Sequence, residues 1–175
     1  MSKKFAKKAI RSGDTITCYD VDRIPHECAV SDLIFRPSIY GLLIRDGKIL
    51  LLPQWDGYDF PGGGLDVHET IEEALVREFW EETGFTVRPK QLINCQSALF
   101  YSKVHRKPFN AILMHYTVTR VSGELSTDNL EPYEKNFSKL SEWVDLDTID
   151  TVKFINDADS TSIIRKALAT LKSAE

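Results

Sequence analysis

The sequence predicts an α/β fold class, with a mixed β-sheet flanked by helices. Three observations support this prediction. Several apolar runs have the length of strands, two segments have the spacing of amphipathic helices, and hairpin signals outnumber crossover connections. The chain has 175 residues, of which 42% are hydrophobic, and this size suits one domain with a sizeable core.

The segments before the first helix are expected to form strands. Residues 15–21 alternate enough in polarity to be a strand, and residues 23–32 are expected to form an irregular connection. Residues 38–54 contain two apolar runs joined by Asp46-Gly47, a dipeptide typical of two-residue hairpin turns. The sequence therefore predicts a hairpin at this point.

Residues 70–83 have the signals of a helix at both ends. Thr70 is a good N-cap, and Glu73 stands three residues later, which completes a capping box. Gly84 is a natural C-terminal stop, because glycine readily adopts the left-handed conformation that ends many helices.

The second half of the chain repeats the mixture of strands and helix. Residues 92–101 and 111–121 are predicted strands, and residues 122–139 are polar and form the longest loop candidate. Residues 142–149 are short and rich in apolar side chains. Residues 157–173 begin with Asp and Ser and continue with apolar residues at helical spacing, which predicts a second helix.

Composition excludes several classes of protein. A formal net charge of −4 makes a general nucleic-acid-binding surface unexpected, and no apolar run is long enough to span a membrane. The first twelve residues are basic but lack the apolar core of a secretory signal, so we expect a basic surface arm. The three cysteines are widely spaced and odd in number, which argues against a disulfide framework and favours a cytoplasmic location.

The predicted first helix carries a dense group of carboxylates. Glu78, Glu81 and Glu82 fall within an arc of roughly 100°. Like charges this close on a helix destabilise it by about 0.2–0.5 kcal/mol per pair. A divalent cation would offset that repulsion, and clustered oxygen ligands suit Mg²⁺ or Mn²⁺. The preceding glycines, residues 62–64, would let a phosphate approach the backbone.

Residues 63–85 resemble the signature of the Nudix hydrolases, in which fixed glycine, glutamate and arginine positions surround a helix. The matching positions are Gly63, Glu69, Arg77, Glu78, Phe79, Glu81, Glu82, Gly84 and Phe85. The resemblance implies the Nudix fold, an α/β/α sandwich with a mixed sheet, over residues 36–175. Residues 1–35 have no counterpart in the family, and we expect them to form an N-terminal extension packed on the domain.

The resemblance also implies a Mg²⁺-dependent hydrolase, with Mn²⁺ as an alternative metal. Such enzymes cleave the pyrophosphate bond of a nucleoside diphosphate linked to another group. By position, Arg77 would pair with Glu69 and hold the loop against the helix, and Glu78 and Glu82 would be catalytic. The implied metal ligands are the Gly63 carbonyl, Glu78, Glu81 and Glu82.

The general base has two candidate sources, Glu78 on the helix and a glutamate from the polar loop. A carboxylate bound to metal is a weak proton acceptor, which favours the loop. Residues 122–139 offer Glu131 and Glu134, and Glu134 is slightly preferred because Pro132 stiffens the chain before it.

The substrate contacts are expected near the end of the strand 92–101. A basic and aromatic segment there would clamp an anionic nucleotide, although it also fits a solvated hairpin end. The candidate residues are Tyr101, Lys103, His105 and Arg106. The expected partner is a nucleotide-type small molecule, and the sequence leaves a homodimer open.

Two other functions fit the same signature. One is a regulator that binds a nucleotide metabolite without turnover, although such proteins usually lose signature glutamates. The other is an isomerase of prenyl diphosphates, which would need a catalytic cysteine such as Cys95. The positions of Tyr101 and Pro108 match no substrate marker of the family cleanly. A nucleoside triphosphate, a nucleotide sugar and a capped RNA end all stay open as substrates.

Overall fold

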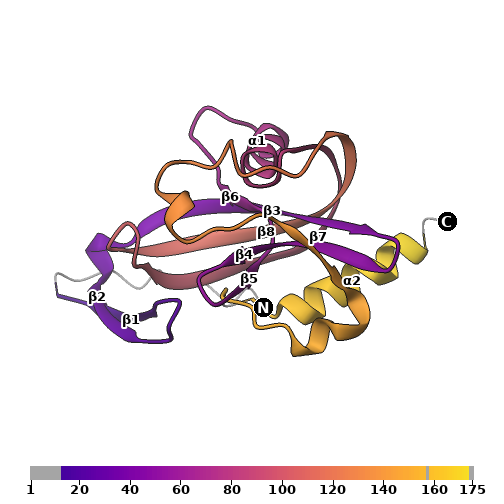
Figure 1. The fold of residues 1–175 in the computed structure, drawn as a ribbon. Coiled ribbons are helices and arrows are strands. Elements are labelled where there is room, and N and C mark those ends of the chain that lie inside the picture. The colour runs from indigo at the N-terminus through magenta and orange to yellow at the C-terminus, as the bar shows by residue number, and fades with distance from the viewer. Residues whose placement is uncertain (1–12, 157, 174–175) are drawn as a thin grey trace, which may run out of the picture. The chain divides into compact units, whose positions relative to one another are not determined.

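A computed structural model describes residues 13–156 and 158–173 (Figure 1). The basic arm predicted at residues 1–12 lies outside these ranges. Contacts divide the chain into two compact units, one made of residues 1–35 with 99–110 and the other of residues 36–98 with 111–175. The packing of residues 1–35 on the domain stays a prediction.

In the first unit, β1 (Thr15–Tyr19) and β2 (Pro25–Ala29) form an antiparallel hairpin. The expectation of an irregular connection over residues 23–32 is therefore wrong: this segment contains β2 and a 3₁₀ turn, η1 (Val30–Asp32). The strand was missed because only Cys28 in it is buried, so no apolar run marks it. Strand β1 also pairs in parallel with β7 at Tyr19 and Phe100.

Beyond β1, the sheet has the order β7-β8-β3-β4-β5, with β6 beside β3 and β9 beside β4; most of these residues belong to the second unit, and residues 34–35, 99–102 and 107–110 belong to the first. Its strands are β3 (Ile34–Arg45), β4 (Lys48–Gln54), β5 (Gly57–Asp59), β6 (Gly62–Gly64), β7 (Phe85–Ser102), β8 (Lys107–Gly123) and β9 (Glu142–Asp145). The predicted hairpin between β3 and β4 is confirmed, because Asp46 and Gly47 have φ angles of 51° and 74°, as a type I′ turn requires.

Helices α1 (Ile71–Thr83) and α2 (Ser160–Lys172) cover opposite faces of this sheet (Figure 1). Leu75 and Phe79 of α1 belong to one apolar cluster, and Ile163 and Ile164 of α2 belong to another. Two further 3₁₀ turns are η2 (Glu134–Asn136) and η3 (Leu146–Thr151). The predicted α/β/α sandwich with a mixed sheet is confirmed.

The ends of α1 are fixed as the sequence predicts. The Thr70 hydroxyl accepts a hydrogen bond from the Glu73 amide, and the Glu73 carboxylate accepts one from the Thr70 amide. Gly84 ends the helix with a φ of 76°, and a Cβ there would lie 2.2 Å from the Glu124 carbonyl oxygen. The backbone of Gly84 also closes on Gly123, where a Cβ would lie 2.1 Å from the Gly84 oxygen. Glycine is thus required twice in this contact.

Within the described residues, no helix combines the length and apolar character needed to cross a bilayer.

Candidate active site

The glycine strand β6 places backbone directly against the carboxylates of α1. Gly62 has a φ of 147°, and a Cβ on it would lie 2.1 Å from the Ile39 carbonyl oxygen in β3. At Gly63, a Cβ would lie 2.5 Å from Glu78 Oε2. A side chain is excluded at Gly62, where the close atoms are backbone, and the short distance at Gly63 shows that its backbone lies beside the Glu78 carboxylate.

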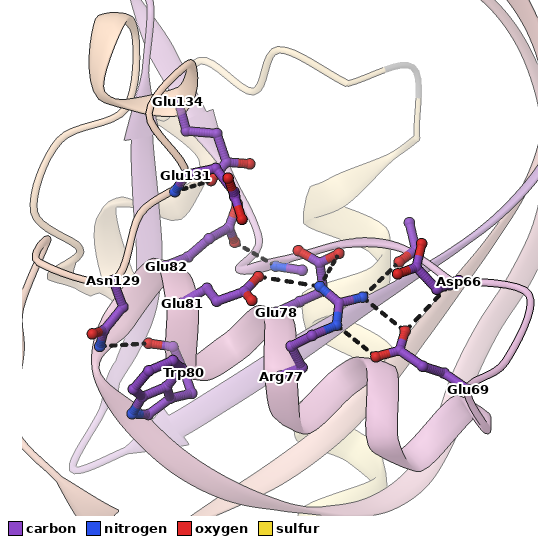
Figure 2. Close-up of polar contacts among 12 residues, drawn as sticks. Asp66, Glu69, Arg77, Glu78, Trp80, Glu81, Glu82, Asn129, Glu131 and Glu134 are labelled. Atoms are coloured by element: carbon purple, nitrogen blue, oxygen red, sulfur yellow. Dashed lines mark hydrogen bonds and ion pairs between the residues drawn. The ribbon is translucent and has the colours of Figure 1, made fainter.

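Arg77 is the centre of an ion-pair network on the same helix (Figure 2). Its Nε and Nη2 donate to the two carboxylate oxygens of Glu69 at 2.6 and 2.8 Å, and Nη2 also donates to the Gly64 carbonyl oxygen at 3.1 Å. Hydrogen bonds from Arg77 lower the pKa of Glu69 to about 2. The pairing that the sequence predicts is therefore formed, and it ties the loop after β6 to α1.

The remaining guanidinium nitrogen of Arg77 holds two of the predicted metal ligands. Nη1 lies 3.0 Å from Glu78 Oε1 and 3.1 Å from Glu81 Oε2. Burial raises the pKa of Glu78 to about 7 despite this cation, and the charges of Glu81 and Glu134 add to the rise. One guanidinium is thus shared among several carboxylates.

Glu82 is the most deeply buried carboxylate of the helix, with only 3% of the residue exposed. The Gly62 amide donates to its Oε2 at 2.6 Å. Burial raises the pKa of Glu82 well above its ordinary value, and the negative charge of Glu78 raises it further. An ionised Glu82 therefore lacks sufficient positive charge around it.

The polar loop adds two more carboxylates on the Glu82 side of the cluster (Figure 2). Glu134 accepts hydrogen bonds at 3.2 Å from the Glu131 amide and from the Tyr133 hydroxyl. Burial raises the pKa of Glu134, and the negative charge of Glu134 raises the pKa of Glu78 and of Glu82. Glu131 is exposed, and its negative charge raises the pKa of Glu81. The geometry thus favours Glu134 over Glu131 as a member of the cluster.

The donor set suits a hard divalent cation. Only carboxylate and carbonyl oxygens are present, and negative charges outnumber the guanidinium of Arg77. In their present rotamers, no three acidic, histidine or cysteine side chains of the described residues converge tightly enough to hold a metal ion. The reason is visible in the hydrogen bonds, since Arg77 and the Gly62 amide hold the carboxylates apart. Binding would require these side chains to turn toward the ion.

The predicted substrate-binding residues lie in the first unit, around the turn between β7 and β8, whereas the carboxylates lie in the second. They are Tyr101, Lys103, His105 and Arg106. Tyr101 stacks on His26 with ring centroids 4.0 Å apart, and Lys103 pairs with Asp22. His105 and Arg106 are exposed. Their role toward a substrate stays a prediction.

Two polar residues beside the carboxylates were not anticipated from the sequence. Burial raises the pKa of Asp59 to about 6, although Asn156 Nδ2 donates a hydrogen bond to it at 2.6 Å. The negative charge of Asp59 also raises the pKa of Glu82. Tyr133 binds Glu134 as described. The position of Asp59, three residues before the glycines 62–64, could have marked it in the sequence as a residue near the site. No feature of the sequence distinguished Tyr133 from other residues of the polar loop.

Known proteins share parts of this sequence. An ADP-ribose pyrophosphatase from Methanocaldococcus jannaschii is 28% identical over 123 residues, which are 67% of this chain and 66% of that enzyme. An RNA pyrophosphohydrolase from Stutzerimonas stutzeri is 38% identical over 64 residues, 35% of this chain and 40% of that enzyme. The chain thus matches less than two thirds of the length of either relative.

The fold and the family model agree with these relatives. A NUDIX hydrolase from Nitrosomonas europaea superposes with a TM-score of 0.60 and 19% identity, covering 78% of this chain and 90% of that one. The family model of the NUDIX domain matches residues 35–167, which include every part of the carboxylate cluster. This chain therefore belongs to the NUDIX domain family.

Proposed function

We propose that this NUDIX protein is a Mg²⁺-dependent hydrolase that cleaves the pyrophosphate bond of a nucleoside diphosphate linked to another group. The observation that carries the proposal is that Glu78, Glu82 and Glu134 are near enough for the charge of Glu134 to raise the pKa of both helix carboxylates. These carboxylates come from the signature helix and from a separate loop, and each has a pKa raised by burial. Such an excess of negative charge is suited to a cation and to an anionic diphosphate carried by it.

Each residue has a proposed part in the reaction. Bound Mg²⁺, held by the Gly63 carbonyl with Glu78, Glu81 and Glu82, would supply charge neutralisation at the diphosphate and acidify a coordinated water. Glu134 accepts the proton of the attacking water, since it lies outside the signature helix and keeps a carboxylate for this purpose. Arg77 orients the helix carboxylates through its bonds to Glu69 and Glu81.

The names of the relatives guide the choice of substrates to test. The relative with the longest aligned stretch among those described above is named for ADP-ribose, and the shorter match is named for RNA. We infer a nucleotide-type substrate held by Tyr101, Lys103, His105 and Arg106, and a cytoplasmic location for the reaction.

The decisive experiment is a turnover assay on ADP-ribose, a nucleotide sugar, a dinucleoside tetraphosphate, a nucleoside triphosphate and 5′-triphosphorylated RNA. Each substrate is incubated with Mg²⁺, with Mn²⁺ and with a chelator, and products are identified by mass spectrometry. We expect metal-dependent cleavage between two phosphorus atoms of at least one substrate. Tight binding of a nucleotide that is never consumed would instead support the regulator without turnover.

A further inference from the structure

The segment that carries Glu134 is fastened to the hairpin between β4 and β5. The Trp55 amide donates to the Phe137 carbonyl oxygen at 3.0 Å, and the Lys139 amide donates to the Pro53 carbonyl oxygen at 3.0 Å. These bonds lie on either side of Ser138. The end of the polar loop is thus held in register with the hairpin, although residues 124–133 form neither helix nor strand.

A ring stack reinforces this attachment. The rings of Trp55 and Phe137 lie 4.3 Å apart at an interplanar angle of 2°. Trp55 occupies the hairpin turn with a φ of 47°, a left-handed conformation in which asparagine or glycine is favoured and a bulky side chain is uncommon. The residue is 39% exposed, so burial in the core does not explain it. Neither the turn conformation nor core packing explains a tryptophan here, so its stack on Phe137 is the contact that accounts for it.

The stacked ring is linked to Glu134 through one tight turn. The amides of Phe137 and Ser138 donate to the Glu134 carbonyl oxygen at 3.0 and 2.8 Å. Only Lys135 and Asn136 separate Phe137 from Glu134, and both belong with Glu134 to η2 (Glu134–Asn136). Because these bonds join the two backbones, a shift of the Phe137 backbone would be transmitted to the backbone of Glu134.

We propose that Trp55 is a positioning residue for Glu134. Its stack on Phe137 fixes the η2 turn so that the Glu134 carboxylate stays with Glu78 and Glu82. The inference rests on the proposed function, in which Glu134 accepts a proton during hydrolysis. A displacement of about 1 Å in such a group can lower a rate by about 100-fold, so the anchoring of the turn matters for turnover.

The first test replaces Trp55 with asparagine, which removes the ring and tolerates the left-handed turn. We expect kcat to fall about 10- to 100-fold, with KM changed less than about twofold, because the base and not the substrate is displaced. Trp55→Phe should recover most of kcat by restoring a stack. Leu92→Ala, which removes another exposed apolar side chain, is the control and should leave kcat unchanged. An unaltered kcat in Trp55→Asn would overturn the proposal.

A double-mutant comparison separates positioning from a merely structural role. In Glu134→Gln protein, Trp55→Asn should lower kcat by less than about twofold further, since the group that Trp55 positions is already inactive. Multiplication of the two single effects would show that Trp55 acts independently of Glu134, which contradicts the inference.

Hydrogen exchange tests the anchoring without any substrate. The amides of Phe137, Ser138 and Lys139 should exchange at least about tenfold faster in Trp55→Asn than in the wild type, whereas amides of α1 should not change. Unchanged exchange over residues 137–139 would refute the anchoring. A wild-type protein with no turnover on any substrate would refute the proposed function instead, and the exchange result would still decide whether Trp55 fixes the turn.

Discussion

At the scale of single residues, each carboxylate of the cluster has a different partner, and that partner determines what its loss should do. The carboxylate of Glu82 is bonded only to the Gly62 amide among the described hydrogen bonds, and it is repelled by Glu78. Its charge therefore destabilises the empty site while serving the proposed metal. Activity and stability should respond to its removal in opposite directions.

The variant Glu82→Gln should lose turnover by two or more orders of magnitude, because about 3 kcal/mol or more of charge stabilisation leaves the transition state. Its midpoint of thermal unfolding without metal should be equal to or above that of the wild type. Glu72→Gln is the matched control, since Glu72 is an exposed glutamate of the same helix. Near wild-type Mg²⁺-dependent turnover in Glu82→Gln would remove Glu82 from the metal site.

Arg77→Ala should lower both stability and activity. The side chain of Glu69 is only 11% exposed, and it would lose its two charged hydrogen bonds from Arg77. Their loss should lower the free energy of unfolding by about 2–3 kcal/mol. Arg165→Ala is the control, because its bridge to Asp150 is 64% exposed on both sides and should contribute less than about 1 kcal/mol. The comparison is made by urea unfolding. If only activity fell, Arg77 would be a direct substrate contact.

Residue roles could be foreseen where both partners lie close in the sequence. Arg77 and Glu69 are eight positions apart within one motif, and the resemblance of that motif to the Nudix signature implied their pairing. Asp59 and Asn156 are 97 positions apart, and their hydrogen bond depends on how β5 meets the segment before α2. No local sequence pattern predicts this contact between distant segments. The same holds for Tyr101 and His26, whose stack joins two separate hairpins.

At the scale of elements, helix α1 was predictable because its ends are encoded locally by Thr70, Glu73 and Gly84. Strand β2 was not, because an edge strand with one buried residue resembles a loop in polarity. The loop predicted at residues 122–139 is irregular over residues 124–133, whereas residues 122–123 end β8 and residues 134–136 form η2. Its attachment to β4 through Lys139 and Phe137 could not be foreseen, since backbone hydrogen bonds are not specific to sequence.

The two loop glutamates should differ sharply in function. Glu134→Gln should lower kcat about 100-fold or more, as expected for the loss of a general base, and Glu131→Gln should lower it less than about threefold. The reason is that Glu134 is partly buried beside Glu78 and Glu82, whereas Glu131 is exposed. Steady-state kinetics on the preferred substrate would measure both. Full activity in Glu134→Gln would make Glu78 the leading candidate for the base.

At the scale of the whole molecule, the cluster couples folding to cation binding. Mg²⁺ that binds only the folded protein should raise stability by about 1.4 kcal/mol at ten times its Kd, which corresponds to about 3–5 °C for a chain of this size. Calorimetry with Mg²⁺, with a chelator and with KCl of equal ionic strength would measure the shift. Glu82→Gln should lose most of it. An equal shift in that variant would place the bound cation elsewhere.

The contact between Gly84 and Gly123 has a consequence for how this chain tolerates mutation. A Cβ on Gly123 would collide with the Gly84 backbone, and a Cβ on Gly84 would collide with the Glu124 backbone, whereas Gly13 and Gly47 have open space around them. In a saturation library sorted for soluble protein, Gly47→Asn should survive, because asparagine accepts the left-handed turn. Gly84→Asn should be depleted even though asparagine often ends helices elsewhere. Divergence at this corner is therefore blocked at two positions, since a side chain at either glycine would collide with backbone atoms of the opposite segment.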